Sequence, residues 1–238
     1  MILIKKVCFI AVLMFLVLGI ALGGNLCEPL YEVSSGVNSK PQIILDAGHG
    51  GFDGGAVASD GTVEKEINLK ICITLAEFLR SGGFEVVLTR SSDVSTDDVD
   101  SDKIAARKKS DLKNRLELMN SYPDAVFVSI HLNKFTTSTA SGSQVFYCGK
   151  TEESAKLGMS IQSSIVSLLQ PDNKRVNKMA NSSTYLLYNA TVPAVLVECG
   201  FLSNKQELEQ LKNEEYQKQM AFSIYCGITE YFMDNKEI

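Results

Sequence analysis

The chain has little histidine and no excess of positive charge. Only two histidines occur among 238 residues, and acidic side chains outnumber basic ones, which gives a net charge of −5. Nucleic-acid-binding proteins normally present a basic face, so this class is not favoured. There is also no internal repeat and no sign of a second domain. With 45% hydrophobic residues, the length suits one well-buried domain.

The first residues have the pattern of an export segment. Lys5 and Lys6 precede an uninterrupted apolar run over 7–22. This pattern predicts a secretory signal peptide over 1–24. Because the apolar run is only slightly shorter than the ~20 residues that span a bilayer, an uncleaved membrane anchor is the alternative. Residues 25–40 are polar and irregular, as expected of a linker. We therefore expect an exported protein that contacts the membrane only through its N-terminal segment, residues 1–24.

Six cysteines in an exported chain raise the question of disulfides. No short-spaced pair indicates a zinc knot or a small disulfide framework. Two of the six lie in the export segment and linker, Cys8 and Cys27. We expect the other four to be free thiols, namely Cys72, Cys148, Cys199 and Cys226.

From residue 41 onward, apolar strands alternate with amphipathic helices. The expected strands cover 41–46, 84–90, 124–131, 142–149, 184–188 and 192–200. The expected helices cover 63–80, 103–121, 152–169, 205–211 and 214–233. In the helix over 103–121, the spacing predicts that Leu112, Leu116 and Met119 face inward. The alternation predicts a single α/β domain over 41–238, a mainly parallel twisted sheet of about six strands with helices on both faces.

Both histidines follow the carboxyl ends of expected strands. His49 lies in "ILDAGHGGFDGGA" and His131 ends "AVFVSIH", while Glu198 ends "PAVLVE". In a parallel sheet these ends share one edge, where α/β proteins bind ligands. Two histidines and a carboxylate at this edge favour a metal site. A phosphate-binding loop is not favoured, because the glycines lack a following GK[ST] and a clean GxGxxG spacing. Instead they let the backbone bend so that His49 can turn onto the edge.

The third ligand is less clear from spacing alone. Glu64 shares the inward helix face with Ile67 and Ile71, whereas Glu66 lies about 200° around the helix and four residues before Lys70, as in a surface ion pair. Glu64 is therefore the better candidate. An acid in the first turn that complements the helix dipole explains Glu64 nearly as well.

Several stretches together resemble a known enzyme family. They are "IILDAGHGGFDGGA", "GTVEKEINL", "VVLTR", "SDLKNRLELMN", "FVSIHLN" and "VPAVLVECGFLSN", in this order from residue 41 to the C-terminus. They resemble the zinc-dependent N-acetylmuramoyl-L-alanine amidases of the amidase-3 type, and most of all the germination-specific members made during sporulation. One stretch departs from the pattern: "NKRVNKMANSSTYLLYN" is more polar than expected before the last strand.

The resemblance implies a metal site and a reaction. One Zn²⁺ would be held by His49, Glu64 and His131, with Glu198 as the catalytic acid/base. The bond cleaved would be the amide between the lactyl group of N-acetylmuramic acid and L-alanine, in spore-cortex peptidoglycan. Zinc with three protein ligands lowers the pKa of water, and Glu198 would carry that water's proton to the departing amine.

Other expectations are less specific. Four polar residues could support the site or bind substrate carboxylates: Asn68, Arg90, Arg115 and Asn133. The alternatives are a zinc peptidase acting on the stem peptide and a non-catalytic wall-binding homologue. Because no wall-binding repeat is present, an anchoring or activating protein partner is expected beside peptidoglycan itself. The expected location is outside the cytoplasmic membrane or between the forespore membranes, either secreted or N-terminally anchored.

Overall fold

The structure is a computed structural model that describes residues 40–234, so the predicted signal segment and nearly all of the linker lie outside the described residues. Its strands are β1 (Gln42–Ala47), β2 (Glu85–Leu88), β3 (Val126–Asn133), β4 (Gln144–Tyr147), β5 (Lys178–Met179) and β6 (Ala194–Phe201). Its helices are α2 (Glu64–Ser81), α3 (Ile104–Asn120), α4 (Glu152–Leu168), α5 (Tyr185–Asn189), α6 (Lys205–Lys212) and α7 (Glu214–Asp234). None of these described helices is long and apolar enough to cross a membrane.

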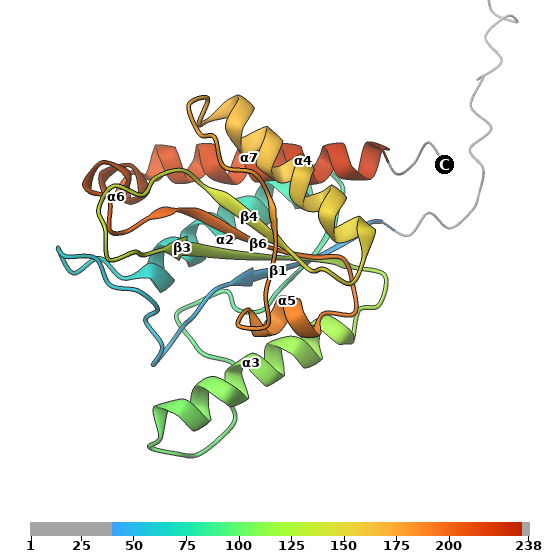
Figure 1. Ribbon diagram of the computed structural model, residues 1–238. Helices are drawn as coiled ribbons and strands as arrows, with labels where there is room; N and C mark the ends of the chain where they lie inside the picture. The colour runs from blue at the N-terminus through green and yellow to red at the C-terminus, as the bar shows by residue number, and fades with distance from the viewer. Residues whose placement is uncertain (1–39, 235–238) are drawn as a thin grey trace, which may run out of the picture. The chain divides into compact units, whose positions relative to one another are not determined.

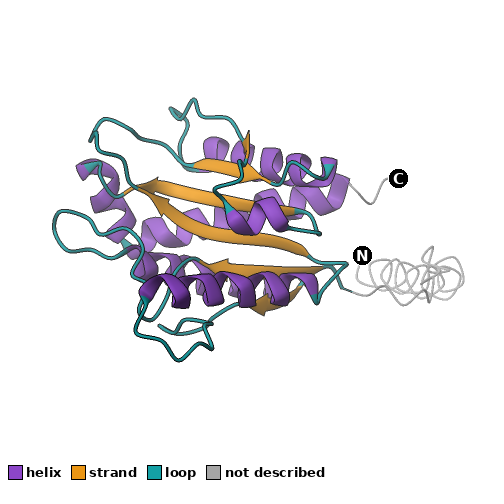
Figure 2. Ribbon diagram, turned by 60° about the horizontal axis from the view of Figure 1, so that its bottom comes forward, coloured by secondary structure: helices purple, strands orange, loops and turns teal. Residues whose placement is uncertain are grey.

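The six strands form one sheet in the order β2-β1-β3-β6-β4-β5 (Figures 1 and 2). The strands β2, β1, β3 and β6 pair in parallel, so their carboxyl ends meet at one edge. β4 pairs antiparallel with β6, and the short strand β5 pairs in parallel with β4. The predicted α/β fold with a mainly parallel sheet is confirmed.

Helices cover both faces of this sheet (Figure 1). On one face, α2, α4 and α7 pack over the larger apolar core, which takes alternate residues of the strands, such as Leu45, Val128 and Val197. On the other face, α3 and α5 pack over a smaller core that includes Phe127 and Met119. Strand residues that alternate between these two cores have side chains on opposite faces.

The segment over 184–188 was expected to be a strand, and this prediction is wrong. It forms the helix α5, in which Leu186 and Leu187 are buried in the smaller core. A short apolar run of this kind fits a buried strand and a buried helix equally well. The sheet also has no place for it between its neighbours, because β4 pairs directly with β6. The sheet's sixth strand is instead β5, which the polar sequence around it does not indicate.

The inward face of α3 also differs from the expectation. Met119 is fully buried and Leu116 partly buried, but Leu112 is 36% exposed. The positions that face the sheet at helical spacing are Asp111 and Arg115, both buried. A buried ion pair therefore takes the place that an apolar stripe would have filled, and it turns Leu112 outward.

The cysteines of the described region form no disulfide. Cys72, Cys148 and Cys199 are buried and Cys226 is partly buried, all with free thiols. Burial raises the pKa of the Cys199 thiol well above its usual value, which keeps this group protonated and unreactive at neutral pH. Cys8 and Cys27 lie outside the described residues.

Candidate active site

The glycine-rich turn after β1 brings its histidine back over the sheet edge. His49 has a φ of 63°, the only non-glycine residue of the described chain with a positive φ. Two other positions of this turn, Gly48 and Gly55, have no room for a side chain. A Cβ on Gly48 would lie 2.3 Å from the ring of His131, and one on Gly55 would lie 2.6 Å from Oε2 of Glu64. The turn therefore stores backbone strain at a functional residue and leaves room for two other side chains.

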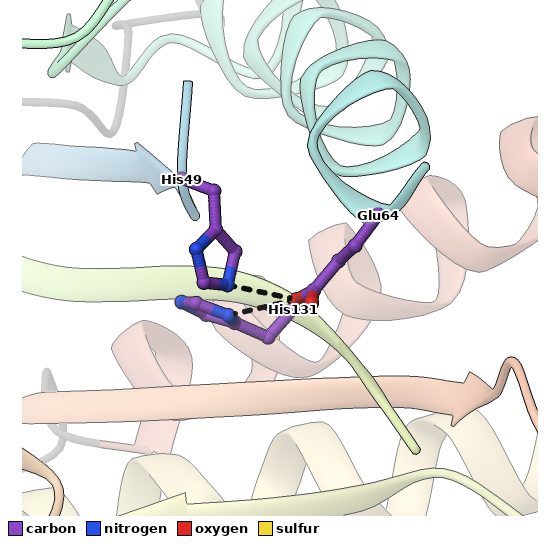
Figure 3. A group of neighbouring side chains, drawn as sticks. All are labelled: His49, Glu64 and His131. Carbon is purple, nitrogen blue, oxygen red and sulfur yellow. Dashed lines mark hydrogen bonds and ion pairs between the residues drawn. The ribbon is translucent and has the colours of Figure 1, made fainter. Parts of the chain in front are cut away.

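Three side chains from distant parts of the sequence meet at this edge (Figure 3). His49 comes from the turn after β1, Glu64 is the first residue of α2, and His131 lies on β3. Oε1 of Glu64 is 3.3 Å from Nε2 of His49 and 3.0 Å from Nδ1 of His131. One potential ligand atom from each residue lies within 4.8 Å of the other two. The structure thus brings together all three residues that the sequence singled out for a metal.

Glu64 is held in place by donors on three sides. Its Oε2 accepts from the backbone N–H of Ala56 at 2.8 Å, and its Oε1 accepts from the backbone N–H of Leu132 at 3.0 Å and from Nδ2 of Asn68 at 3.2 Å. Burial alone would raise the pKa of this carboxyl, but the two histidines outweigh burial and hold the pKa well below its usual value. Glu64 is therefore ionised and fixed in one orientation, as a metal ligand must be.

The side chain of Glu66 points away from the site, on the solvent-exposed face of α2. Glu64 is 3% exposed, whereas Glu66 lies on the exposed face of α2, as the helix geometry predicts. The ion pair expected between Glu66 and Lys70 does not form. Nζ of Lys70 instead lies 3.4 Å from Oε1 of Glu214 on α7. The two glutamates are therefore well suited as a test residue and its control.

His49 has a carboxylate partner that the sequence analysis missed. Its Nδ1 donates to Oδ2 of Asp53 at 2.9 Å, which leaves Nε2 facing Glu64. The other oxygen of Asp53 lies 2.8 Å from Nζ of Lys108 on α3. In the metal-free protein, burial lowers the pKa of His49, but the bonds to Asp53 and Glu64 outweigh it and raise the pKa to about 9, so metal binding must displace a proton from this ring. A carboxylate that fixes the tautomer of a histidine in this way is typical of metal ligands, and Asp53 was visible in the same glycine-rich turn.

This donor set fits zinc. Two imidazole nitrogens and one carboxylate oxygen are a known ligand set of catalytic zinc sites, which keep the fourth position open. The short distances among Glu64 and the two histidines are those of ligands already gathered around one point. Harder cations such as Mg²⁺ and Ca²⁺ prefer sites built from oxygen alone.

Glu198 lies beside this group on the next strand. It pairs in register with His131, so both side chains are on the same face of the sheet. Its neighbour Cys199 is on the opposite face, in the larger core. Oε2 of Glu198 is buried and has no hydrogen-bond partner in the described part of the chain. Burial raises the pKa of Glu198 to about 7 and outweighs the charge of His131, which lowers it.

Two of the predicted support residues brace the turn. Nδ2 of Asn68 donates to Oε1 of Glu64 and to the carbonyl of Gly48, both at 3.2 Å. Arg90 is buried and donates only to backbone carbonyls, those of Ala47, Gly48, Lys65 and Ser92. Arg90 therefore holds the ends of the turn together, which the sequence could not distinguish from a role in substrate binding.

Arg115 has a similar role from the other face. It is ion-paired with Asp46 and Asp111 in the protein interior, and its Nη2 donates to the carbonyl of His49 at 2.8 Å. Asn133, at the end of β3, is partly buried where the register between β3 and β6 shifts. The structure gives its side chain no hydrogen bond within the described residues.

A small cavity opens beside the two histidines, with a volume of about 240 Å³. Its lining joins the metal-ligand candidates to the residues of α3: Asp46, Gly48, His49, Asp53, Lys108, Asp111, Leu112, Arg115, His131 and Leu186. The exposed position of Leu112 is explained here, because its side chain forms part of the cavity wall. The cavity thus gives access to both histidines from this side.

Comparison with known proteins identifies the class. The family model described as N-acetylmuramoyl-L-alanine amidase matches residues 43–230. The germination-specific N-acetylmuramoyl-L-alanine amidase of Bacillus subtilis is 36% identical over 192 residues, which cover 81% of this chain and 80% of the relative. The chain therefore belongs to the N-acetylmuramoyl-L-alanine amidase family, as the sequence motifs predict. It is a hydrolase of the amide bond between N-acetylmuramic acid and L-alanine.

Solved structures of N-acetylmuramoyl-L-alanine amidases have the same fold as this chain. The CwlD amidase from Clostridioides difficile, solved in complex with the GerS lipoprotein, has a TM-score of 0.79 at 41% identity, covering 82% of this chain and 100% of that one. An N-acetylmuramoyl-L-alanine amidase from Clostridium difficile 630 has a TM-score of 0.71 at 32% identity, covering 82% and 97%. The expected likeness to germination-specific amidases is confirmed.

Proposed function

We propose that His49, Glu64 and His131 hold one Zn²⁺ and that Glu198 carries the proton in hydrolysis of the amide between the lactyl group of N-acetylmuramic acid and L-alanine. The convergence of the three ligand atoms within 4.8 Å is the observation that carries this proposal. The position of Glu198 supports it, because the register places its carboxyl next to His131 on the same face.

In this proposal the bound metal and Glu198 have separate roles in hydrolysis. When bound, zinc supplies a Lewis acid that polarises a carbonyl oxygen and lowers the pKa of water. Glu198 takes the proton from the attacking water as the new C–O bond forms. It then gives this proton to the alanine nitrogen as the C–N bond breaks, because an amine leaves poorly unless it is protonated. Burial, which raises the pKa of this carboxyl above its ordinary value, favours a group that can hold a proton and then release it.

The biological setting is part of the proposal. Likeness to a germination-specific relative supports spore-cortex peptidoglycan as the substrate, acted on after export of the protein. The export segment predicted over residues 1–24 supports a location outside the cytoplasmic membrane, either secreted or N-terminally anchored. A lipoprotein accompanies the CwlD amidase in its structure, which supports a protein partner for this chain as well.

Metal analysis of single variants tests the assignment of roles. His49→Ala, Glu64→Ala and His131→Ala should each lose zinc and activity together, because three protein ligands leave no redundancy. Glu66→Ala is the matched control and should lose neither, since its side chain is exposed. Zinc measured by atomic spectroscopy beside turnover on muropeptides decides the result.

Glu198 gives the complementary result. Glu198→Ala should keep its zinc while activity falls by roughly 10²–10⁴-fold, as is typical of a lost general acid/base. Loss of zinc from this variant, or loss from Glu66→Ala but not from Glu64→Ala, would show that the roles are assigned wrongly.

A further inference from the structure

Side chains from four successive segments form a row across the sheet at the active edge. His131 on β3 pairs in register with Glu198 on β6, and Glu198 pairs in register with Gln144 on β4. Cross-strand partners have their side chains on the same face, so Gln144 lies directly beside the proposed proton carrier. Oε1 of Gln144 then accepts from Nη1 of Arg175 at 3.0 Å. The row therefore runs from the metal-ligand candidates to a guanidinium.

Arg175 is held rigidly in this position. Its Nε donates to the carbonyl of Ser141 at 2.7 Å, and its guanidinium carbon lies 4.8 Å from the ring centroid of Phe201. Stacking on an aromatic ring and two directed hydrogen bonds fix the plane of the group.

The guanidinium forms no direct ion pair with a described residue, although its charge partly opposes the rise in the pKa of Glu207, whose carboxyl lines the same cleft. Arg107 and Arg115 are ion-paired with aspartates, but no carboxylate of the described chain lies within ion-pairing distance of Arg175. Its Nη2 also makes no hydrogen bond to any described residue, whereas Nε and Nη1 are both used. A fixed arginine with free donors is suited to bind a carboxylate from outside the protein.

Arg175 opens onto a cleft of about 580 Å³, a volume typical of ligand sites. Polar side chains share the lining with it, namely Gln170, Asn173, Lys174, Gln210 and Tyr216. Two acids also border the cleft. Both oxygens of Glu207 accept from backbone N–H groups, and Asp172 is exposed. Three of the lining residues, Asn173, Lys174 and Arg175, begin the polar stretch that departs from the family pattern in the sequence.

The distance from His131 to Arg175 can be spanned by a short extended peptide. Neighbouring strands lie about 4.8 Å apart, so Gln144 is roughly 10 Å from His131, and Arg175 is one side chain farther. An extended peptide spans about 3.3–3.6 Å per residue, so roughly three residues reach Gln144 and roughly four to five reach Arg175.

We propose that Arg175 and the cleft beside it form a subsite for a free carboxylate of the peptidoglycan stem peptide, roughly four to five residues from the amide that is cleaved. This inference rests on the proposed function and specifies its substrate, a stem peptide that is anionic at that distance. Arg175 is a specificity-determining residue in this scheme and takes no part in proton transfer.

Matched substrates test the subsite on the zinc-loaded protein. Two muropeptides are compared, one with its stem carboxylates free and one with them amidated. The wild-type protein should show a KM roughly 10–100-fold higher for the amidated substrate, with kcat nearly unchanged. Arg175→Gln should raise KM for the free-carboxylate substrate by about the same factor and remove the difference between the two. Arg80→Gln is the control, because Arg80 is an exposed arginine in the last turn of α2 that donates only to the carbonyl of Val86.

Each other outcome has a definite meaning. Equal KM values in the wild-type protein would overturn the subsite, and this comparison needs no variant to fold. An equal loss on both substrates in Arg175→Gln would also overturn it, by showing a merely structural arginine. If neither muropeptide is hydrolysed, the proposed function fails. Calorimetric titration of the chelator-treated protein with the isolated stem peptide then decides the subsite, with binding to wild type but not to Arg175→Gln as the supporting result.

Discussion

The proton-carrier assignment predicts that Glu198 destabilises the metal-free protein at neutral pH. Its carboxyl lies next to His131 with one oxygen lacking any partner in the described chain, and burial raises its pKa from 4.5 to about 7. A raised carboxyl pKa means that the folded protein holds the proton more tightly than the unfolded chain does. The contribution to stability is thus full below about pH 4.5 and is lost as the pH rises to about 7. The loss amounts to roughly 3 kcal/mol at 1.36 kcal/mol per pKa unit.

Glu198→Gln removes this ionisation. In chelator-treated protein at about pH 8, the variant should be more stable than wild type by up to roughly 3 kcal/mol, and at about pH 4.5 the two should be nearly equal. Urea denaturation at both pH values gives the free energies of unfolding. A difference that is the same at both pH values, or a variant less stable at pH 8, would refute the reasoning.

Glu207 provides a control of opposite sign. It is also a buried glutamate with a raised pKa, and the cause is again burial. Its two oxygens, however, accept from the backbone N–H groups of Gly142 and Phe201 at 2.7 and 2.8 Å. Glu207→Gln would turn an NH₂ group toward one of these donors, so it should destabilise the protein by about 1–3 kcal/mol.

Three further predictions concern the site and the residues that support it. Gly55→Ala should lower zinc affinity because its Cβ would meet Glu64, whereas Gly61→Ala has open space and a similar positive φ and should cost only stability, as zinc titration and thermal melting will show. Asp46→Asn leaves Arg115 without its strongest partner in the interior and should destabilise the protein by about 3–5 kcal/mol in urea denaturation. Since burial is outweighed by Arg115 and the pKa of Asp46 falls to about 2, its stabilising effect should be present above about pH 4 and disappear toward pH 2. A chelator should abolish turnover, and added Zn²⁺ should restore it.

The sequence predicts the parts of the fold that follow from local patterns. The strand before His49 and the strands that carry His131 and Glu198 could be recognised from their apolar runs, and parallel pairing then places these residues on one edge. The helical period also separates Glu64 from Glu66 correctly. These features depend on residues close together in the chain.

Other features depend on contacts between distant segments, and the sequence does not reveal them. The apolar run over 184–188 becomes α5 because β4 occupies the place next to β6. Leu112 turns outward because the Asp111–Arg115 pair is tied to Asp46, far away in the sequence. Arg90 is an arginine, as substrate-binding residues often are, but its N–H groups donate to backbone carbonyls. Only the folded turn brings these carbonyls close to it.

Mass spectrometry of peptidoglycan digested by the zinc-loaded protein tests the central claim most directly. We expect stem peptides that begin with a free L-alanine amine, together with glycan strands whose lactyl groups carry no peptide, and neither product from Glu198→Ala. Cleavage within the stem peptide would instead identify a zinc peptidase. Undigested peptidoglycan that retains the protein would identify a non-catalytic wall-binding homologue, and either result would contradict the account.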